Sequence, residues 1–166
     1  YMSSNAVVTG NVDVQQHLNV ATDAIVTGNV DVQTDLNIVG NVYASSNIVT
    51  TGNVDVQTNL NVAADAIVTG NVYASSNAVV TGNVDVQQNL NVATDAIVTG
   101  NVDVQSELNV TGNAYIASNA VVTGNVDVQT NLNVATDAIV TGNVDVQTDL
   151  NVTGNVYASS NIVTTG

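Results

Sequence analysis

The sequence predicts an all-β solenoid, a rod of six-residue strands in which three strands close one triangular coil. Three observations predict this fold. The chain divides every six residues from Asn5 to Gly166 without an insertion, apolar and polar residues alternate within each unit, and glycine recurs at one position. A short fixed period is the signature of solenoids, because each unit buries its apolar side against its neighbours.

Each six-residue unit, which we call a hexad with positions 1 to 6, reads as one short strand followed by a bend. Positions 2 and 4 are nearly always Val, Leu, Ile or Ala, and positions 1, 3 and 5 are mostly Asn, Asp, Gln, Thr or Ser. This period of two indicates a strand with one buried face, and β-branched Val suits a pleated surface. Positions 2 and 4 are therefore predicted to form the core, with positions 1, 3 and 5 facing solvent.

The bends are predicted at the junction between positions 6 and 1. All twelve glycines stand at position 6, and Asn or Asp usually follows at position 1. Because Gly and Asn tolerate a positive φ angle, we expect the chain to turn there and expect φ to be the reason for glycine.

The kind of residue at position 3 indicates how many hexads close one coil. If three hexads close it, residue i stacks on residue i+18, and most stacked pairs then match as polar or apolar; with two hexads few of them match. Stacked neighbours in a sheet favour like with like. The predicted outward columns are Val7–Ile25–Tyr43, Val79–Ile97–Tyr115 and Val121–Ile139–Tyr157, with Asp13 over Asp31, Asp85 over Asp103 and Asp127 over Asp145.

A longer repeat lies above the hexad. Residues 11–52, 83–124 and 125–166 are copies of a seven-hexad unit, and residues 53–82 are a shortened copy of five hexads. Because seven hexads are not a whole number of coils, the outward motifs are predicted to wind round the rod, with no face collecting one residue type along its full length. Residues 1–166 are expected to form a single continuous rod, a fragment of a longer repetitive chain, since no capping segment is visible.

The charge balance excludes several classes of partner. The chain has no Lys or Arg and fourteen acidic residues, giving a formal charge of −14. Without cations it is not expected to bind nucleic acid, whose phosphates need basic residues. No apolar run approaches the roughly 18 residues of a membrane span, so membrane insertion is not expected either. No cofactor is expected; Ca²⁺, which takes six to eight oxygen ligands, is the one ion that stacked carboxylates could attract.

The aliphatic residues two apart in a period of six resemble the left-handed β-helix of hexapeptide-repeat proteins, over the whole chain. This resemblance implies a left-handed coil. Sequence segments such as GNVYASSN and LNVTGNV also resemble repeat segments in fibre-like surface proteins of large marine algal viruses and in phage tail fibres. In such fibres three chains can wind together, each hexad still forming one face of a prism.

Catalysis is not expected from this chain. Hexapeptide-repeat acyltransferases use a histidine between subunits, and His17 is the one histidine here. Those enzymes also need loops and basic groups for the acyl carrier, and this chain has neither. A single histidine cannot form a three-histidine zinc site. His17 is therefore interpreted as a substitution of Asn at a solvent-facing corner.

The sequence favours a structural role: the shaft of an extracellular or virion-surface fibre, assembled from copies of itself end to end and also side by side. The alternative is a surface binding module for polysaccharide or ice that uses the outward columns. Exposed apolar residues at position 3 are the candidates for lateral contact, because exposed apolar patches mark interaction surfaces. They are Ile25, Tyr43, Ile67, Tyr73, Ile97, Tyr115, Ile139 and Tyr157.

Overall fold

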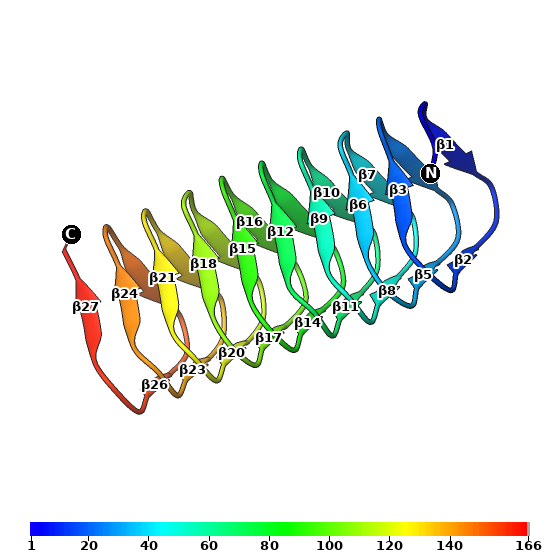
Figure 1. Ribbon diagram of the computed structural model, residues 1–166. Helices are drawn as coiled ribbons and strands as arrows, with labels where there is room; N and C mark the ends of the chain where they lie inside the picture. The colour runs from blue at the N-terminus through cyan, green and yellow to red at the C-terminus, as the bar shows by residue number, and fades with distance from the viewer. Residues whose placement is uncertain (166) are drawn as a thin grey trace.

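The computed structural model describes residues 1–165 and shows β-strands wound into a straight rod, with the two ends of the chain at opposite ends of the rod (Figure 1). Each strand is three residues long and occupies positions 2 to 4 of a hexad. Positions 5, 6 and 1 carry the chain round to the next face. The strands form three parallel sheets of nine strands each, so the expected triangular all-β solenoid is confirmed. The left-handed sense of the coil stays a prediction.

The three sheets are named after their first strands. The β1 sheet contains β1 (Ala6–Val8), β4 (Ala24–Val26), β7 (Val42–Ala44), β10 (Leu60–Val62), β13 (Ala78–Val80), β16 (Ala96–Val98), β19 (Ala114–Ile116), β22 (Leu132–Val134) and β25 (Leu150–Val152). The β2 sheet contains β2 (Val12–Val14), β5 (Val30–Val32), β8 (Ile48–Thr50), β11 (Ala66–Val68), β14 (Val84–Val86), β17 (Val102–Val104), β20 (Ala120–Val122), β23 (Ala138–Val140) and β26 (Val156–Ala158). The β3 sheet contains β3 (Leu18–Val20), β6 (Leu36–Ile38), β9 (Val54–Val56), β12 (Val72–Ala74), β15 (Leu90–Val92), β18 (Leu108–Val110), β21 (Val126–Val128), β24 (Val144–Val146) and β27 (Ile162–Thr164).

The register of the sheets places each residue over the residue one coil later. Val7 pairs with Ile25, and Ile25 pairs with Tyr43. Asp13 lies over Asp31 in the β2 sheet, as the column prediction requires. The coil of three hexads is therefore confirmed, and a coil of two hexads is wrong. At a strand spacing of about 4.8 Å the nine coils give a rod roughly 40 Å long.

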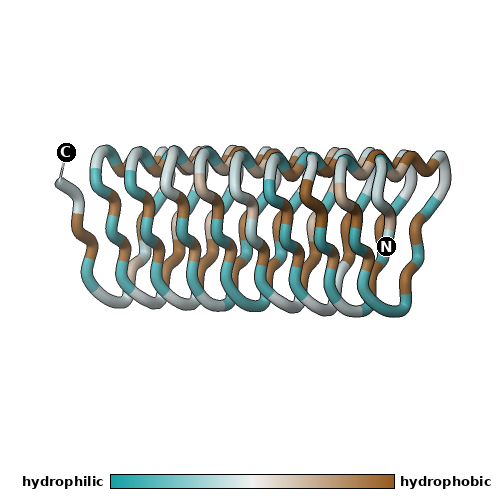
Figure 2. The backbone as a smooth tube through the Cα atoms, turned by 45° about the horizontal axis from the view of Figure 1, so that its top comes forward, coloured by the Kyte–Doolittle hydropathy of each residue, from teal (hydrophilic) through white to brown (hydrophobic). Residues whose placement is uncertain are grey.

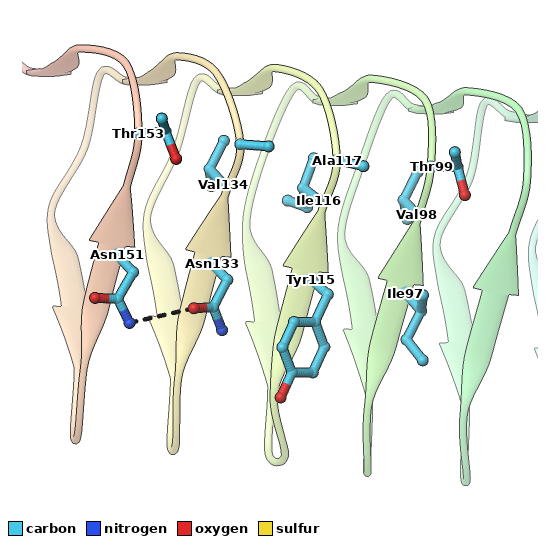
Figure 3. A pocket seen from close by; sticks show the side chains of 11 residues that line it. Ile97, Val98, Thr99, Tyr115, Ile116, Ala117, Asn133, Val134, Asn151 and Thr153 are labelled. Atoms are coloured by element: carbon cyan, nitrogen blue, oxygen red, sulfur yellow. Dashed lines mark hydrogen bonds between the residues drawn. The ribbon is translucent and has the colours of Figure 1, made fainter.

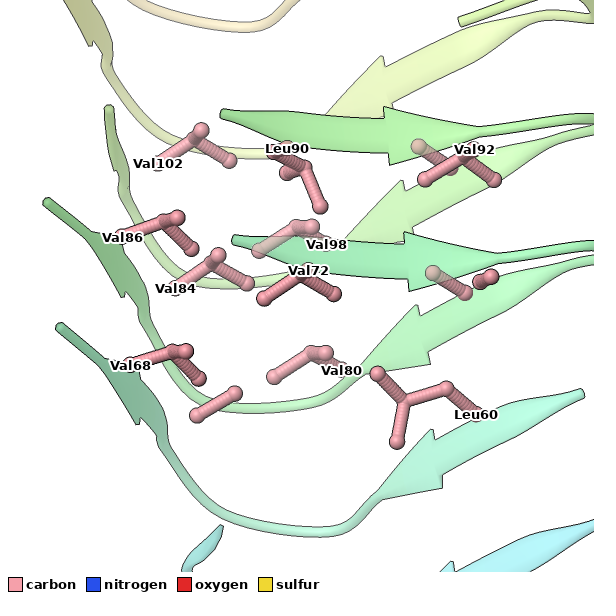
Figure 4. Close-up of a cluster of buried hydrophobic side chains, with 14 of the residues drawn as sticks. Leu60, Val68, Val72, Val80, Val84, Val86, Leu90, Val92, Val98 and Val102 are labelled. Atoms are coloured by element: carbon pink, nitrogen blue, oxygen red, sulfur yellow. The ribbon is translucent and has the colours of Figure 1, made fainter. Parts of the chain in front are cut away.

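The core runs along the axis of the rod and consists of the side chains at positions 2 and 4, as predicted. Figure 4 shows these side chains projecting inward from strands of different faces, and Figure 2 shows the alternation of apolar and polar residues along the chain. Burial is complete in the middle coils, where Val86 and Val104 are fully buried. It falls off at the ends, where Val12 and Val14 are half-buried because only one neighbouring coil covers them.

The volume of the core is balanced within single coils. In most coils the three residues at position 2 are one Ala, one Val and one Leu, for example Ala78, Val84 and Leu90. In another coil Ala114 occupies position 2, and the larger Ile116 at position 4 of the same strand restores volume. Close-packed interiors tolerate substitutions best when the total volume is kept. The residue types at the inward positions therefore vary between hexads, whereas the total volume of the inward side chains in a coil stays similar.

Among the described residues, Thr50 is the polar residue that lies buried in the core. Thr50 occupies position 4 of β8, is 1% exposed, and its hydroxyl has no hydrogen-bond partner. Most other strands carry Val, Ile or Ala at this position. A buried hydroxyl without a partner costs free energy because it has lost its bonds to water.

Glycine stands at the corners for a reason other than the predicted one. None of the described residues has a positive φ angle, so the expectation that glycine supplies φ is wrong. The reason is the close approach of successive coils. A Cβ at Gly100 would lie 2.6 Å from Asn83 Oδ1 and 2.6 Å from the carbonyl carbon of Gly82 in the coil before it.

The corners are also tied together by side-chain hydrogen bonds. The side-chain oxygen at position 1 accepts a bond from the backbone N–H of the residue that stacks on it in the next coil; Asp95 accepts from Asn113 at 2.7 Å, and Asn11 accepts from Asn29 at 2.9 Å. Every acidic residue at position 1 has glycine at position 6 of the hexad two further along the chain. An aspartate carboxylate can then approach the next coil, and charged acceptors form shorter bonds, whereas Glu107, within the described part of the chain, accepts only from the Asn125 side chain at 3.4 Å. Among the described residues, the acid–glycine pairs are Asp23–Gly40, Asp35–Gly52, Asp65–Gly82, Asp95–Gly112, Glu107–Gly124 and Asp137–Gly154.

We predict that Gly100→Ala destabilises the rod by about 2 kcal/mol or more, since backbone atoms on the preceding coil must move to admit the methyl group. Gly10→Ala is the matched control, because nothing lies within 4 Å of a Cβ at Gly10. Urea unfolding followed by circular dichroism measures both. Equal effects of the two substitutions would show that close approach is not what selects glycine.

We expect Thr50→Val to stabilise the protein by about 1 kcal/mol, because the change keeps the shape and removes a buried hydroxyl that has no partner. Thr51→Val, in the same hexad but on the exposed side, is the control and should change the free energy of unfolding little. The same urea titration tests both. A loss of stability in Thr50→Val would mean that the hydroxyl has a partner in solution.

Candidate functional site: the outward faces and corners

The predicted lateral-contact residues are exposed, and the structure distributes them unequally over the three faces. Four of them lie on the β1 face: Ile25, Tyr43, Ile97 and Tyr115, each between 40% and 45% exposed. Three lie on the β2 face, namely Ile67, Ile139 and Tyr157. Tyr73 is alone on the β3 face, between Asp55 and Asn91. The three predicted outward columns are all present.

The β1 face repeats its outward residues every four coils. Val7, Ile25, Tyr43 and Asn61 follow one another at position 3, and then Val79, Ile97, Tyr115 and Asn133 repeat the same order. As expected from the sequence, none of the three faces collects one residue type along its full described length, but two copies of the motif return to the β1 face instead of winding on to another. The shortened unit is the reason, because residues 11–82 together span a whole number of coils and return the motif to its starting face.

In the described part of the chain, the outward carboxylates lie on the other two faces. Among the described residues, the nine at position 3 of the β1 sheet include no Asp or Glu. Acidic residues border this face only at its corners, at position 1. The β2 face carries Asp13, Asp31, Asp85 and Asp103, and the β3 face carries Asp55, Asp127 and Asp145. Two faces of the rod are thus acidic, and the third is uncharged.

Open hollows lie beside the tyrosines of the β1 face. One hollow of about 330 Å³ extends from Ile97 past Tyr115 to Asn133. Its floor is low because position 5 there is Ala117 and Ala135, between Thr99 and Thr153 (Figure 3). A second, of about 230 Å³, lies beside Tyr43 with Ala63 as its small residue. A similar hollow lies beside Tyr73 on the β3 face. The sequence analysis did not identify the alanines and asparagines that line these hollows. The signal that could have predicted the hollows is an alanine at position 5 of the hexad one coil after each tyrosine.

His17 stands at a solvent-facing corner, as predicted, and the structure adds a partner. Its Nδ1 lies 3.2 Å from Asp35 Oδ2 in the next coil, which is an ion pair when the imidazole is protonated. The imidazole interrupts the corner ladder. The N–H of Asp35 has no position-1 acceptor within the described part of the chain, and the buried Thr34 hydroxyl likewise has no partner. Thr58 and Thr130 are the other two corner threonines with unpaired hydroxyls.

The acidic side chains stack in pairs on the β2 and β3 faces. Asp85 lies over Asp103 and Asp127 over Asp145, as predicted from the columns. Across residues 1–165, no group of three or more His, Cys, Asp or Glu side chains converges as a metal site would require. Ca²⁺ binding, suggested from the sequence, stays a prediction.

Comparisons with protein-family models, with curated proteins and with solved structures find no match. The described residues also contain no helix long and apolar enough to cross a membrane. The site is therefore interpreted from its own geometry: an uncharged face with regularly placed tyrosines and hollows, on a rod whose other two faces are acidic.

We predict that His17→Asn stabilises the rod by about 1 kcal/mol, because an amide oxygen at this position can accept from the Asp35 N–H, as Asn29 Oδ1 accepts from the N–H of Asn47. For a domain of this size that corresponds to roughly 2–4 °C in melting temperature. His17→Ala, which offers no acceptor, is the control. If both variants melt at the same temperature, the missing acceptor is not what limits this corner.

Proposed function

We propose that this chain is a structural protein, the shaft of an extracellular or virion-surface fibre. Its partner is a further coil of the same kind, stacked on the end of the rod. The β-solenoid architecture supports a structural role, since every strand adds to one of three continuous hydrogen-bonded sheets along the axis. Length and stiffness follow from the number of coils, so the same design serves a fibre of any length.

The observation that carries the proposal is the unbroken strand pairing along the axis. Each of the three sheets contains nine parallel strands among the described residues, and position 2 is buried in every inner coil. Each coil therefore offers the next one the same pairing edge and the same apolar core, so further coils of this kind extend the rod. Gly166, which we expected to lead into the next coil, lies outside the described residues.

The surface is consistent with a shaft that stays dispersed in solution. With fourteen acidic residues and no Lys or Arg, rods repel one another at long range. Repulsion between the acidic faces limits indiscriminate side-by-side aggregation, and it leaves growth along the axis favoured.

A surface module that binds polysaccharide is the second candidate. The observation that favours it is the recurrence of one hollow, in which an aromatic ring and an asparagine amide lie side by side, next to Tyr43, Tyr73 and Tyr115. Concave sites of this kind hold ligands through an apolar wall and a few polar groups. Ice binding has no comparable support, because position 5 of the β1 face mixes Thr with Ala and Ser.

We expect the protein at low ionic strength, where the acidic rods repel one another, to form unbranched filaments whose width is that of one rod, because end stacking buries the apolar residues at position 2 of the outermost coils. Negative-stain electron microscopy measures the width, and fibre diffraction should show an axial reflection near about 4.8 Å. Ile162→Asp, which charges the exposed end, should shorten or abolish the filaments. Short single particles at every concentration would contradict the proposal.

A further inference from the structure

The β1 face is the one surface through which two copies of this rod can meet without burying carboxylates. A contact through the β2 face would bury Asp85 and Asp103 against the same residues of the partner, and the chain has no Lys or Arg to pair with them. Burying unpaired like charges is strongly unfavourable. The β3 face has the same difficulty at Asp127 and Asp145. Charge alone therefore selects the β1 face for self-association.

The outward residues of this face also complement themselves when one copy is turned end for end. Tyr43 and Tyr115 stand four coils apart, and a hollow with an asparagine lies one coil beyond each of them. An antiparallel partner can therefore place its two tyrosines over the two hollows at the same time. The register that sets tyrosine against tyrosine leaves both hollows empty, so it fills the interface less well.

We propose that two copies pair side by side, antiparallel, through the β1 face, about a two-fold axis between β13 and β16. Tyr43 then faces Asn133 of the second copy, and Tyr115 faces its Asn61. Val79 faces Ile97 of the second copy at the centre, where both are apolar. An apolar centre with polar groups around it is the usual anatomy of an interface, and tyrosine is enriched there because its ring is apolar and its hydroxyl is polar.

The size of the contact fits a reversible dimer. About eight coils at roughly 4.8 Å, on a face roughly 15 Å wide, give about 600 Å² on each copy, near the lower limit of specific interfaces. The acidic corners that border the face, such as Asp23 and Asp95, lie at the rim, where water and salt screen their repulsion. Pairing is therefore stronger at high ionic strength.

This inference deepens the structural role proposed above, but the two can fail separately. End-to-end filaments depend on the end coils, whereas pairing depends on the β1 face. Filaments one rod wide at high salt, where pairing should be strongest, would support the shaft and overturn the pairing. Discrete pairs without filaments would do the reverse.

The first experiment is sedimentation equilibrium of the whole chain in low and high NaCl. We expect a monomer–dimer equilibrium that shifts at least tenfold toward dimer between about 20 and about 500 mM salt, as screening predicts. Ile97→Asp should weaken pairing at least tenfold. Ile139→Asp is the matched control, because Ile97 and Ile139 occupy identical Asp-Ala-Ile-Val-Thr-Gly hexads and are 41% and 42% exposed, on different faces. A monomeric protein at high salt, or equal effects of the two variants, would overturn the proposal.

The second experiment tests the register by disulfide cross-linking. The chain has no cysteine of its own, so only the introduced cysteines can form disulfides. In the proposed pair, Ile25 faces Asn151 of the second copy. Under mild oxidation a mixture of Ile25→Cys and Asn151→Cys proteins should form a disulfide between copies, whereas neither protein should do so alone. Cross-linking of Ile25→Cys with itself would indicate parallel rods. Preferential cross-linking of Ile25→Cys with Asn133→Cys would indicate the register with tyrosine against tyrosine, and either result would overturn the proposed arrangement.

Discussion

The stacking of each residue on its counterpart one coil later is the constraint on which the rest of this structure depends. Because side chains alternate between core and solvent along each strand, a single inserted residue would turn every later side chain to the wrong side. Only whole hexads can be gained or lost without that effect. The two lengths of the longer repeat, seven hexads and five, obey this rule.

Because the coils stack directly on one another, the corners restrict which residue types can occupy positions 6 and 1. Successive coils approach so closely at position 6 that a Cβ is excluded wherever the neighbouring side chain is a carboxylate held against the backbone, as at Asp95 and Gly112. Where position 6 is Ser or Thr, its hydroxyl can donate to an asparagine instead, as Thr94 does to Asn77 at 2.7 Å. Glycine packed against Asp or Asn, as at Asp95–Gly112 and Asn83–Gly100, and a hydroxyl bonded to Asn are thus two ways to close the same corner.

The number of hexads between two copies of a motif decides which face the motif occupies. A seven-hexad step moves a motif to a neighbouring face, so a chain of such units would spread its tyrosines and aspartates round the rod. The five-hexad unit at residues 53–82 returns the next copy of the motif to the β1 face. This face therefore carries two copies of the same outward sequence. A change in repeat length, with no new residue type, is thereby enough to create an uncharged face on an acidic rod.

The sequence by itself determined the strands, the inward positions 2 and 4, the corner positions and the coil of three hexads, because these follow from local alternation and from matching neighbours. It determined that Ile97 and Tyr115 stack and that His17 stands at a corner. Only the tertiary structure decided why glycine occupies position 6, since Gly100 has no unusual φ and its constraint comes from Asn83 in another coil. It alone brought His17 Nδ1 within 3.2 Å of the Asp35 carboxylate and formed the hollow over Ala117. The physical reason is that in-or-out placement is a property of one strand, whereas corners, hollows and the charge of a face arise from residues a whole coil apart.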